Sequence, residues 1–449
     1  MSFWLCERLA QWAQEGDAPA LIWHDQPTGY ADLLAQMAQW EETLKQRGIG
    51  TGSVVGLVGS FSPSACALLL ALIAQRAITV VLAAPSPALL ELAEAQWLFC
   101  VDEKDGVTLT EPGHARTHRL YEELIAQDRP GLVIFSSGSS GTPKAILHDF
   151  EALLAKFQTP RQRKMTLGFL LFDHIGGLDT LFGTLASGGT LVATQRDRCD
   201  PEAVCAAIAR HKVHTLPTSP TFLNLVLLSE AYVRHDLSSL AVITYGTEPM
   251  PERTLTRLHE VLPGVALVQT YGLSELGVLR SRSKDSGSLW VRFADRDTGF
   301  ETQIRGGVLW VRSASAMRGY LNAPELFDPD GWLNTQDAVE LDESGEYLRI
   351  LGRVTDLINV GGQKVYPTEV ESVLLELGNV RDVAVAGEAN LLTGQIVTAR
   401  FQLCQPEELT AFKRRLRTFC QGRLAPYQTP VRITLTEEAL HGARFKKLR

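Results

Sequence analysis

The stretch Ser136–His148 reads SSGSSGTPKAILH, a run of small and hydroxylic residues that leads into a lysine. It follows Gly131–Phe135 (GLVIF), whose apolar and β-branched residues predict a buried strand. Without bulky side chains, backbone N–H groups can approach an anion, while hydroxyls add donors and Lys144 adds charge. A flexible linker has a similar Ser/Gly composition, but a proline and a lysine at fixed positions argue against one. The stretch therefore predicts a phosphate-binding loop.

This loop differs from the P-loop of kinases and GTPases, which requires G-x-x-x-x-G-K-[ST]. Counted from Gly138, the second glycine position holds Pro143, and Ala145 follows the lysine. The sequence therefore disfavours P-loop chemistry, and other residues must handle the phosphates.

Two acidic residues further along are candidates for this role. Glu275 lies in LVQTYGLSELG (267–277) and could ligate Mg²⁺, which prefers carboxylate and phosphate oxygens. Asp337 ends WLNTQD (332–337) and could accept hydrogen bonds from sugar hydroxyls, as acids do in other nucleotide sites. Considered alone, Glu275 is most simply a solvated glutamate and Asp337 an aspartate in a turn. The lysines of the final GARFKKLR, considered alone, are most simply part of a solvated tail.

Bulk properties narrow the class of protein. The 449 residues allow two or three domains, and the net charge of −8 argues against nucleic acid or an anionic membrane as the main partner. The first residues lack a basic segment followed by a long apolar one, and the apolar run 65–74 is too short to span a bilayer. Seven cysteines without a C-x-x-C pair read as free thiols. These features predict a cytoplasmic protein.

The elements that must position these residues alternate between helix and strand. Helices are expected at 32–45, 64–74, 201–211 and 252–261, and strands at 54–58, 79–82, 213–216 and 240–244. Such alternation predicts an α/β fold of helix-covered β-sheets. From about Gly306 the chain reads as short strands (GGVLWVRS, YLRILGR, VRDVAVAG, IVTARFQL), with helices at 367–377 and 406–420. We expect a large N-terminal domain, residues 1–352, and a small mobile α+β C-terminal domain, residues 353–449.

The ordered series of motifs resembles the adenylate-forming superfamily of acyl-CoA and aryl-CoA synthetases, carrier-protein adenylation domains and luciferases. The resemblance rests on SSGSSGTPK, FDHIGG, YGTEP, TYGLSE, GVLWVRSASAMRGYLN, NTQD, GRVTDLINVGGQKVYPTEVE and the terminal lysines. It implies that ATP and a carboxylic acid form an acyl-adenylate and pyrophosphate. In a second step a thiol, on CoA or on a phosphopantetheinyl carrier protein, takes the acyl group.

The resemblance also implies roles for individual residues. Lys446 would offset the charge that builds up as the carboxylate attacks phosphorus, Glu275 would ligate Mg²⁺, and Ser274 would hold a phosphate through its hydroxyl. Asp337 would bind the ribose hydroxyls, assisted by Arg353. The full set assigned to ATP is Ser136, Ser137, Gly138, Ser139, Ser140, Gly141, Thr142, Lys144, Gly246, Thr247, Glu248, Tyr271, Gly272, Asp337 and Arg353.

The sequence departs from the family pattern at three places. Phe445 stands where the family has a glycine before the catalytic lysine, and Lys447 follows, so Lys446 is chosen by its spacing to Arg449. Gln336 replaces the glycine of Thr-Gly-Asp. Thr355 occupies the hinge position that is generally Asp or Lys, about which the family turns its C-terminal domain between half-reactions.

For the acid, the resemblance assigns His174 to the acyl tunnel and favours compact ligases of o-succinylbenzoate or benzoate type. The acyl-binding residues it implies are Asp173, His174, Gly177, Tyr245, Gly272 and Leu273, and Gly361 and Gly362 would approach the acceptor thiol. His174 could instead be a hydrogen-bonded structural residue. Asp173 leaves open a free-standing amino-acid adenylation enzyme, in which an aspartate pairs with the substrate amine. A non-catalytic nucleotide-binding relative is a third reading, disfavoured by intact Glu275, Asp337 and Lys446.

Overall fold

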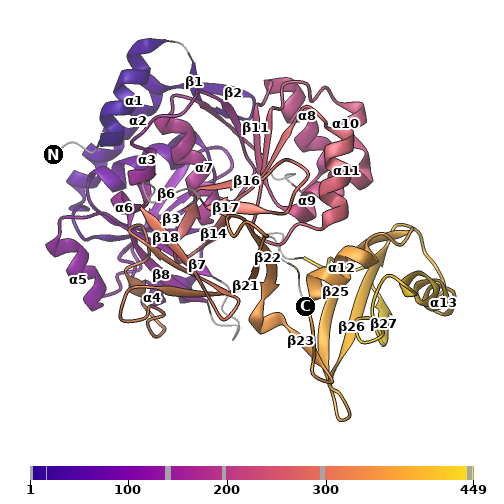
Figure 1. The fold of residues 1–449 in the computed structure, drawn as a ribbon. Helices are drawn as coiled ribbons and strands as arrows, with labels where there is room; N and C mark the ends of the chain where they lie inside the picture. The colour runs from indigo at the N-terminus through magenta and orange to yellow at the C-terminus, as the bar shows by residue number, and fades with distance from the viewer. Residues whose placement is uncertain are drawn as a thin grey trace.

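The structure is a computed structural model that describes residues 4–16, 18–136, 143–194, 199–293, 299–441 and 447. Residues Ser137–Thr142 and Lys446 lie outside the described residues, so their assigned roles stay predictions. The described part of the chain forms a large α/β N-terminal part and a smaller C-terminal part beside it (Figure 1), which confirms the predicted fold class.

The N-terminal part contains a mainly parallel sheet and a mixed sheet whose central strands β7, β4, β3 and β5 are parallel. The first follows the order β13-β12-β11-β9-β10-β1-β2 and the second the order β20-β8-β7-β4-β3-β5-β6. Their central strands are apolar on both faces, as in VVGLV of β3, because helices cover both sides. Their bounds are β1 Pro19–Trp23, β2 Gln26–Gly29, β3 Val54–Val58, β4 Ile78–Leu82, β5 Trp97–Val101, β6 Val107–Thr110, β7 Gly131–Ser136, β8 Lys144–Asp149, β9 Met165–Gly168, β10 Thr190–Ala193, β11 Thr215–Thr218, β12 Val242–Tyr245, β13 Ala266–Gln269 and β20 Gly319–Tyr320.

Several helices of this part cross over between parallel strands, for example α3 between β3 and β4 and α11 between β12 and β13. Helix α3 is apolar all round and buried, and it begins after Ser62, whose hydroxyl accepts a hydrogen bond from the Ala65 N–H. On one face of the first sheet, α8, α9 and α11 pack over β11–β13 in a single hydrophobic cluster. The bounds are α1 Trp4–Glu15, α2 Tyr30–Gln46, α3 Pro63–Ala74, α4 Pro87–Leu92, α5 Arg119–Ala126, α6 Phe150–Leu154, α7 Ile175–Ala186, α8 Pro201–His211, α9 Pro220–Ser229, α10 Ala231–Arg234 and α11 Glu252–Val261.

A third, antiparallel sheet follows the order β16-β17-β22-β21-β19-β18, and the hairpin β14–β15 lies before it in the chain. Strand β22 ends at Arg353, and the short 3-10 turn Val354–Asp356 follows it. The bounds are β14 Tyr271–Leu273, β15 Gly277–Leu279, β16 Ser281–Ser283, β17 Val291–Phe293, β18 Phe300–Arg305, β19 Val308–Ser313, β21 Leu333–Leu341 and β22 Leu348–Arg353.

The C-terminal part has its own sheet and its own core (Figure 1). The strands follow the order β24-β23-β26-β25, with β27 parallel to β26, and α12 and α13 pack against them. The bounds are β23 Ile358–Val360, β24 Gln363–Val365, α12 Pro367–Leu374, β25 Val380–Asn390, β26 Gly394–Leu403, α13 Leu409–Cys420 and β27 Arg432–Leu435. A domain boundary at Arg353 stays a prediction.

Within the described ranges, no helix is both long and apolar enough to cross a membrane.

Candidate functional site

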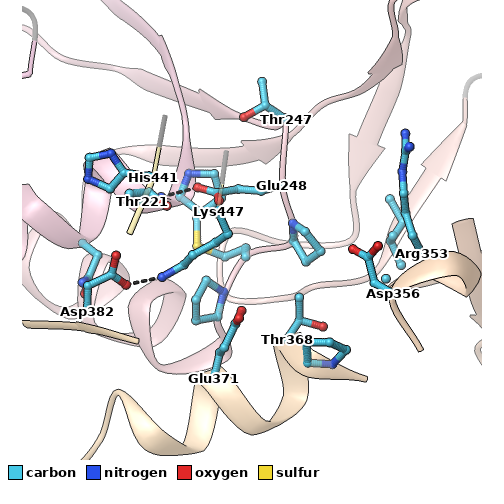
Figure 2. A pocket seen from close by; sticks show the side chains of 18 of the residues that line it. Thr221, Thr247, Glu248, Arg353, Asp356, Thr368, Glu371, Asp382, His441 and Lys447 are labelled. Carbon is cyan, nitrogen blue, oxygen red and sulfur yellow. Dashed lines mark hydrogen bonds and ion pairs between the residues drawn. The ribbon is translucent and has the colours of Figure 1, made fainter. Parts of the chain in front are cut away.

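A cavity of about 820 Å³ lies between the two parts of the chain (Figure 2). Its N-terminal wall comes from the carboxyl ends of β11, β12 and β13 and from the residues that follow them. Its opposite wall comes from α12, the start of β25 and the C-terminal residues. The lining that the argument uses is Thr221, Thr247, Glu248, Gln269, Tyr271, Gly272, Leu273, Asp337, Arg353, Thr355, Asp382, His441 and Lys447. Ligands of α/β proteins bind at such strand ends.

Asp337 is the centre of a buried hydrogen-bonded group in this cavity. Strands β21 and β22 pair it with Arg353, whose Nε lies 3.6 Å from its carboxylate. The Tyr271 hydroxyl donates to Asp337 Oδ2 at 2.6 Å, and the Asp337 N–H donates to Thr335 Oγ1 at 3.1 Å. Burial and this carboxylate raise the pKa of Tyr271 well above its usual value, so the phenol remains a donor. The structure therefore brings three predicted ATP residues together around one carboxylate.

Gln336, which departs from the family glycine, holds a left-handed backbone conformation with φ +61°. Its side chain is exposed, and its N–H donates to Asn334 Oδ1 at 2.9 Å. A non-glycine residue pays about 1–2 kcal/mol for such a conformation, so the turn keeps the geometry that a glycine would adopt freely.

Replacing Gln336 by glycine is expected to stabilise the protein. The relief of left-handed strain exceeds the added chain entropy of glycine, which leaves a gain of about 0.5–1 kcal/mol. Chemical unfolding of the purified variant measures this difference. Gln336→Ala is the control, because it removes the same side chain without relieving the strain, and it should be less stable than the glycine variant. Equal stability of the two variants would contradict the prediction.

The segment after β12 forms the cavity wall near Glu248. Gly246 is buried, and a Cβ there would stand 2.6 Å from Thr270 Oγ1, so only glycine fits. Thr247 has φ +71°, a strained conformation for a β-branched residue and one that concentrates at functional sites. Glu248 Oε1 accepts from the Thr221 N–H at 2.7 Å (Figure 2). Burial raises the pKa of Glu248 from 4.5 to about 7, although that hydrogen bond and the Lys447 ammonium act the other way.

This shift predicts how Glu248 affects stability against pH. Between pH 4.5 and about 7, the folded protein holds the Glu248 proton more tightly than the unfolded chain. The contribution of Glu248 to stability therefore falls as the pH rises through this window. Glu248→Gln keeps the acceptor oxygen for Thr221 and cannot ionise, so its unfolding midpoint should rise relative to wild type as the pH increases. A difference between the two midpoints that is constant from pH 5 to 8 would count against this shift.

Lys144 and Glu275 are held by residues that sequence reasoning missed. Strands β7 and β8 pair Ser136 with Lys144, which places the two ends of the predicted phosphate loop opposite each other. The Lys144 ammonium lies 5.1 Å from the centre of the Tyr320 ring. The Tyr320 hydroxyl donates to Glu275 Oε1 at 2.7 Å. Tyr320 thus connects the lysine of the phosphate loop with the predicted metal ligand.

Asn322 and His148 complete this support. Asn322 accepts from the Ala145 N–H and donates to the Pro143 carbonyl, both at 2.9 Å, which fixes the backbone on each side of Lys144. His148 Nε2 is hydrogen-bonded to the Ser274 carbonyl at 2.7 Å, and burial lowers the pKa of this histidine to about 4, so it stays neutral. Tyr320 and Asn322 belong to GYLN within a quoted motif, which was the available signal.

The residues around Glu275 fit a magnesium ion bound mainly through phosphate. One carboxylate oxygen accepts from Tyr320, and the other oxygen can face a cation. Across the described ranges, His, Cys, Asp and Glu side chains form no group of three that could hold a metal. One protein carboxylate plus phosphate oxygens is an ordinary way to bind Mg²⁺, so this donor set suits the predicted role.

The predicted acyl residues fall into two places. Gly272 and Leu273 line the cavity, whereas Asp173, His174, Gly177 and Tyr245 are not among its lining residues. His174 is the N-cap of α7, and its Nδ1 accepts from the Gly176 N–H at 3.1 Å, which gives this residue a structural function. A Cβ on Gly177 would stand 1.9 Å from the Leu171 carbonyl oxygen, so helix packing accounts for that glycine. Their acyl-binding roles stay predictions.

Lys447, near the end of the chain, lines the cavity. Its Nζ pairs with Asp382 and donates to the Val383 carbonyl at 2.8 Å (Figure 2). His441 and Lys447 form an isolated antiparallel bridge. The Lys447 ammonium is thus paired within the C-terminal sheet, and the catalytic role of Lys446 stays a prediction.

Gly361 and Gly362, predicted to approach the thiol, occupy the exposed turn between β23 and β24. They are not among the residues that line the cavity. The Gly361 N–H donates to the Thr393 carbonyl at 2.8 Å, which ties this turn to the tip of the β25–β26 hairpin. The structure therefore places His441 and Lys447 at the cavity, whereas Gly361 and Gly362 are not part of its lining.

Comparison with known proteins places this geometry in a family. The AMP-binding enzyme family matches residues 9–321, and the AMP-binding enzyme C-terminal domain matches residues 369–445. Relatives include the long-chain-fatty-acid–CoA ligase FadD13 of Mycobacterium tuberculosis, 28% identical over 326 residues (68% of this chain, 63% of the relative). Another is the 4-coumarate–CoA ligase-like 6 protein of Arabidopsis thaliana, 26% identical over 357 residues (73% and 62%). The chain spans less than two thirds of the length of these relatives.

Solved structures share the fold over almost the whole chain. The anthranilate CoA ligase AuaEII in complex with anthranoyl-AMP has a TM-score of 0.84 at 20% identity, with 99% of this chain and 96% of that one covered. The o-succinylbenzoate CoA synthetase of Bacillus subtilis, in complex with its acyl-adenylate, has a TM-score of 0.75 at 23% identity (98% and 96%). Because the family match covers most of the sequence, the chain belongs to the AMP-binding enzyme family.

Proposed function

We propose that this protein is an AMP-forming acid–thiol ligase. A carboxylate oxygen attacks the α-phosphorus of ATP, pyrophosphate leaves, and an acyl-adenylate forms. A thiol then attacks the acyl carbonyl, the thiol proton is lost, and AMP departs. The observation that carries this proposal is the group formed by Asp337, Tyr271 and Arg353 at the cavity between the two parts of the chain.

Each residue would act on a separate part of the reaction. Asp337 would hold the ribose hydroxyls, and Glu275 would hold a magnesium ion, which supplies charge neutralisation at the phosphates. Lys144 would support the leaving pyrophosphate beside Tyr320. Lys446 would offset the negative charge that develops as the carboxylate attacks. A cavity between two parts of the chain also allows water to be excluded from a hydrolysable adenylate.

We further propose an aryl or small acyl acid as the substrate and CoA as the thiol. CoA is supported by the relatives named as CoA ligases. The aryl acid is supported by the structural likeness to the two aryl-CoA enzymes. A phosphopantetheinyl carrier protein is the alternative acceptor, because it presents the same thiol arm.

The C-terminal part, residues 353–449, would act as a lid that turns about Thr355 between the two steps. Gly361 and Gly362 must move toward the cavity for the second step, since they now lie in an exposed turn. Among the described residues, few hydrogen bonds cross the cleft. Examples are those from Arg253 Nη1 to the Leu375 carbonyl at 3.2 Å and from Asn224 Nδ2 to the Arg381 carbonyl at 3.4 Å. An interface with so few bonds would allow the C-terminal part to rotate.

The test is ATP–pyrophosphate exchange with a panel of aryl acids, short fatty acids and amino acids, followed by thioester formation with CoA. Exchange that depends on an aryl or small acyl acid supports the proposal. Exchange that requires an amino acid, and that is lost in Asp173→Ala, would replace it with an amino-acid adenylation enzyme. ATP binding without exchange for any acid would replace it with a non-catalytic relative.

A further inference from the structure

A short segment, residues 317–322, lies between the two elements that are predicted to handle the phosphates, and its backbone is hydrogen-bonded to both. The Met317 N–H donates to the Glu275 carbonyl at 2.7 Å. The Leu321 N–H donates at 2.9 Å to the carbonyl of Ala145, which follows the lysine of the phosphate loop. These bonds fix the segment against both elements, so that a side chain on it can contact both.

Tyr320 is the side chain that does so. It is only 5% exposed, and its ring belongs to a hydrophobic core cluster, so packing fixes its position. Its hydroxyl donates to Glu275 Oε1 at 2.7 Å, and the Lys144 ammonium lies 5.1 Å from the centre of its ring. One rigid side chain therefore contacts the predicted metal ligand through its oxygen and the predicted phosphate-binding lysine through its ring.

The hydroxyl determines how Glu275 presents its carboxylate to a cation. The backbone bond from Met317 fixes the main chain of Glu275 but leaves its side-chain torsions free. A donor on one carboxylate oxygen restricts those torsions and leaves the other oxygen for the ion. Groups that hydrogen-bond a ligating side chain orient it in this way, and their loss costs about 10–100-fold in metal affinity.

The ring acts on the other partner. Lys144 is half-buried, and its ammonium sits on a long stem with several rotatable bonds. A cation is attracted to the face of an aromatic ring at this distance, which favours the rotamers that keep the ammonium beside Tyr320. This attraction does not require the hydroxyl, so a phenylalanine at position 320 would preserve it.

Resting on the function proposed above, we propose that Tyr320 is a positioning residue that couples metal binding to nucleotide binding. Its hydroxyl orients Glu275 for the magnesium ion, and its ring holds Lys144 for the phosphates. Loss of the hydroxyl alone weakens the contribution of the metal, whereas loss of the whole ring also weakens the contribution of the lysine. A tyrosine that only filled the core would show no such division.

The first experiment measures the binding of β,γ-imido-ATP to the purified protein by calorimetry, with Mg²⁺ or with a chelator, in the absence of any acid. The ratio of the two dissociation constants is the metal enhancement. Tyr320→Phe is expected to reduce this enhancement about tenfold or more and to leave the metal-free affinity unchanged. Tyr320→Leu should reduce the enhancement equally and also lower the metal-free affinity about fivefold, because the cation–π contact is lost.

Tyr121→Phe is the matched control. Tyr121 is also buried and its hydroxyl also donates, at 2.8 Å, but to the Ala93 carbonyl instead of a predicted metal ligand. This variant should keep both wild-type affinities. A full enhancement in Tyr320→Phe would overturn the inference, and so would an equal loss of metal-free and metal-dependent affinity in that variant. A wild-type protein without any metal enhancement would overturn it as well.

A double-variant cycle then shows whether Tyr320 acts through Glu275. Glu275→Gln removes the charge that the metal requires and keeps an oxygen for the Tyr320 hydroxyl. Adding Tyr320→Phe to it should reduce the enhancement no further, since the hydroxyl then has no metal ligand to orient. Additive losses would contradict the inference. These measurements need no acid, so they decide on Tyr320 separately from the exchange assay, whose failure with every acid would overturn the proposed function.

Discussion

Replacing Lys446 by alanine is expected to lower the rate of adenylate formation by about 10²–10³-fold, the usual cost of losing one preorganised charge-stabilising group. Attack of a carboxylate on the α-phosphorus brings two anions together, and the ammonium offsets the charge that develops. The second step starts from a finished adenylate and has no such need. ATP–pyrophosphate exchange measures the first step, and thioester formation from synthetic acyl-adenylate measures the second, which should be affected much less.

The neighbouring lysine is the matched control. The Lys447 side chain is only 11% exposed and pairs with the buried Asp382, so Lys447→Ala leaves a buried carboxylate without its cation. Breaking a buried pair from one side costs about 3–5 kcal/mol of stability, and the unfolding midpoint of this variant should fall, whereas that of Lys446→Ala should not. Equal loss of both half-reactions in Lys446→Ala would contradict its assignment. So would a selective loss of adenylation in a Lys447→Ala protein of wild-type stability.

Asp337→Asn is expected to raise the KM for ATP by about 10–100-fold, since hydrogen bonds to a charged group are worth about 1.5–3 kcal/mol. The amide keeps the shape of the side chain but accepts through one oxygen, and the Tyr271 hydroxyl already donates to the carboxylate at 2.6 Å. The ribose hydroxyls would then compete with Tyr271 for one acceptor. Initial-rate exchange over a range of ATP concentrations measures the change.

Asp328→Asn serves as the comparison for this variant. Asp328 is also paired with an arginine, since Arg305 Nη1 donates to it at 2.8 Å, but it does not line the cavity. Its substitution should leave the KM for ATP unchanged. An Asp337→Asn enzyme with the wild-type KM for ATP would remove Asp337 from the nucleotide site.

The boundaries of helices could be predicted to within a few residues where residues typical of a helix start stand next to them in the sequence. Helices α8 and α11 match their expected ranges. Asp200 caps α8 and Pro201 is its first residue, and the acid Glu252 is the first residue of α11. Helix α13 starts at Leu409, three residues later than expected, because Glu408 accepts from the Ala411 N–H and acts as the cap.

Strand β11 shows why another boundary was missed by two residues. It was expected to end at Leu216 but continues through Pro217 to Thr218. A proline normally argues against the interior of a sheet. Here β11 pairs with β9 only at Thr215, which leaves an open edge beyond it where a missing N–H costs no ladder bond.

The site itself was predictable only in part. Asp337, Arg353 and Tyr271 were identified from motifs, and pairing of β21 with β22 brings two of them together. The clamp by Asn322 on Pro143 and Ala145 joins residues nearly 180 positions apart. No local pattern encodes such a contact, since it depends on β20 pairing with β8.

The position of Arg353 has a consequence for the order of events. It is the last residue of β22, opposite Asp337, and only Val354 separates it from Thr355. A nucleotide held by Asp337 and Arg353 would therefore restrict rotation about the proposed pivot at Thr355, and its departure would remove that restraint. Release of AMP would in this way permit the proposed lid, residues 353–449, to turn back before the next turnover.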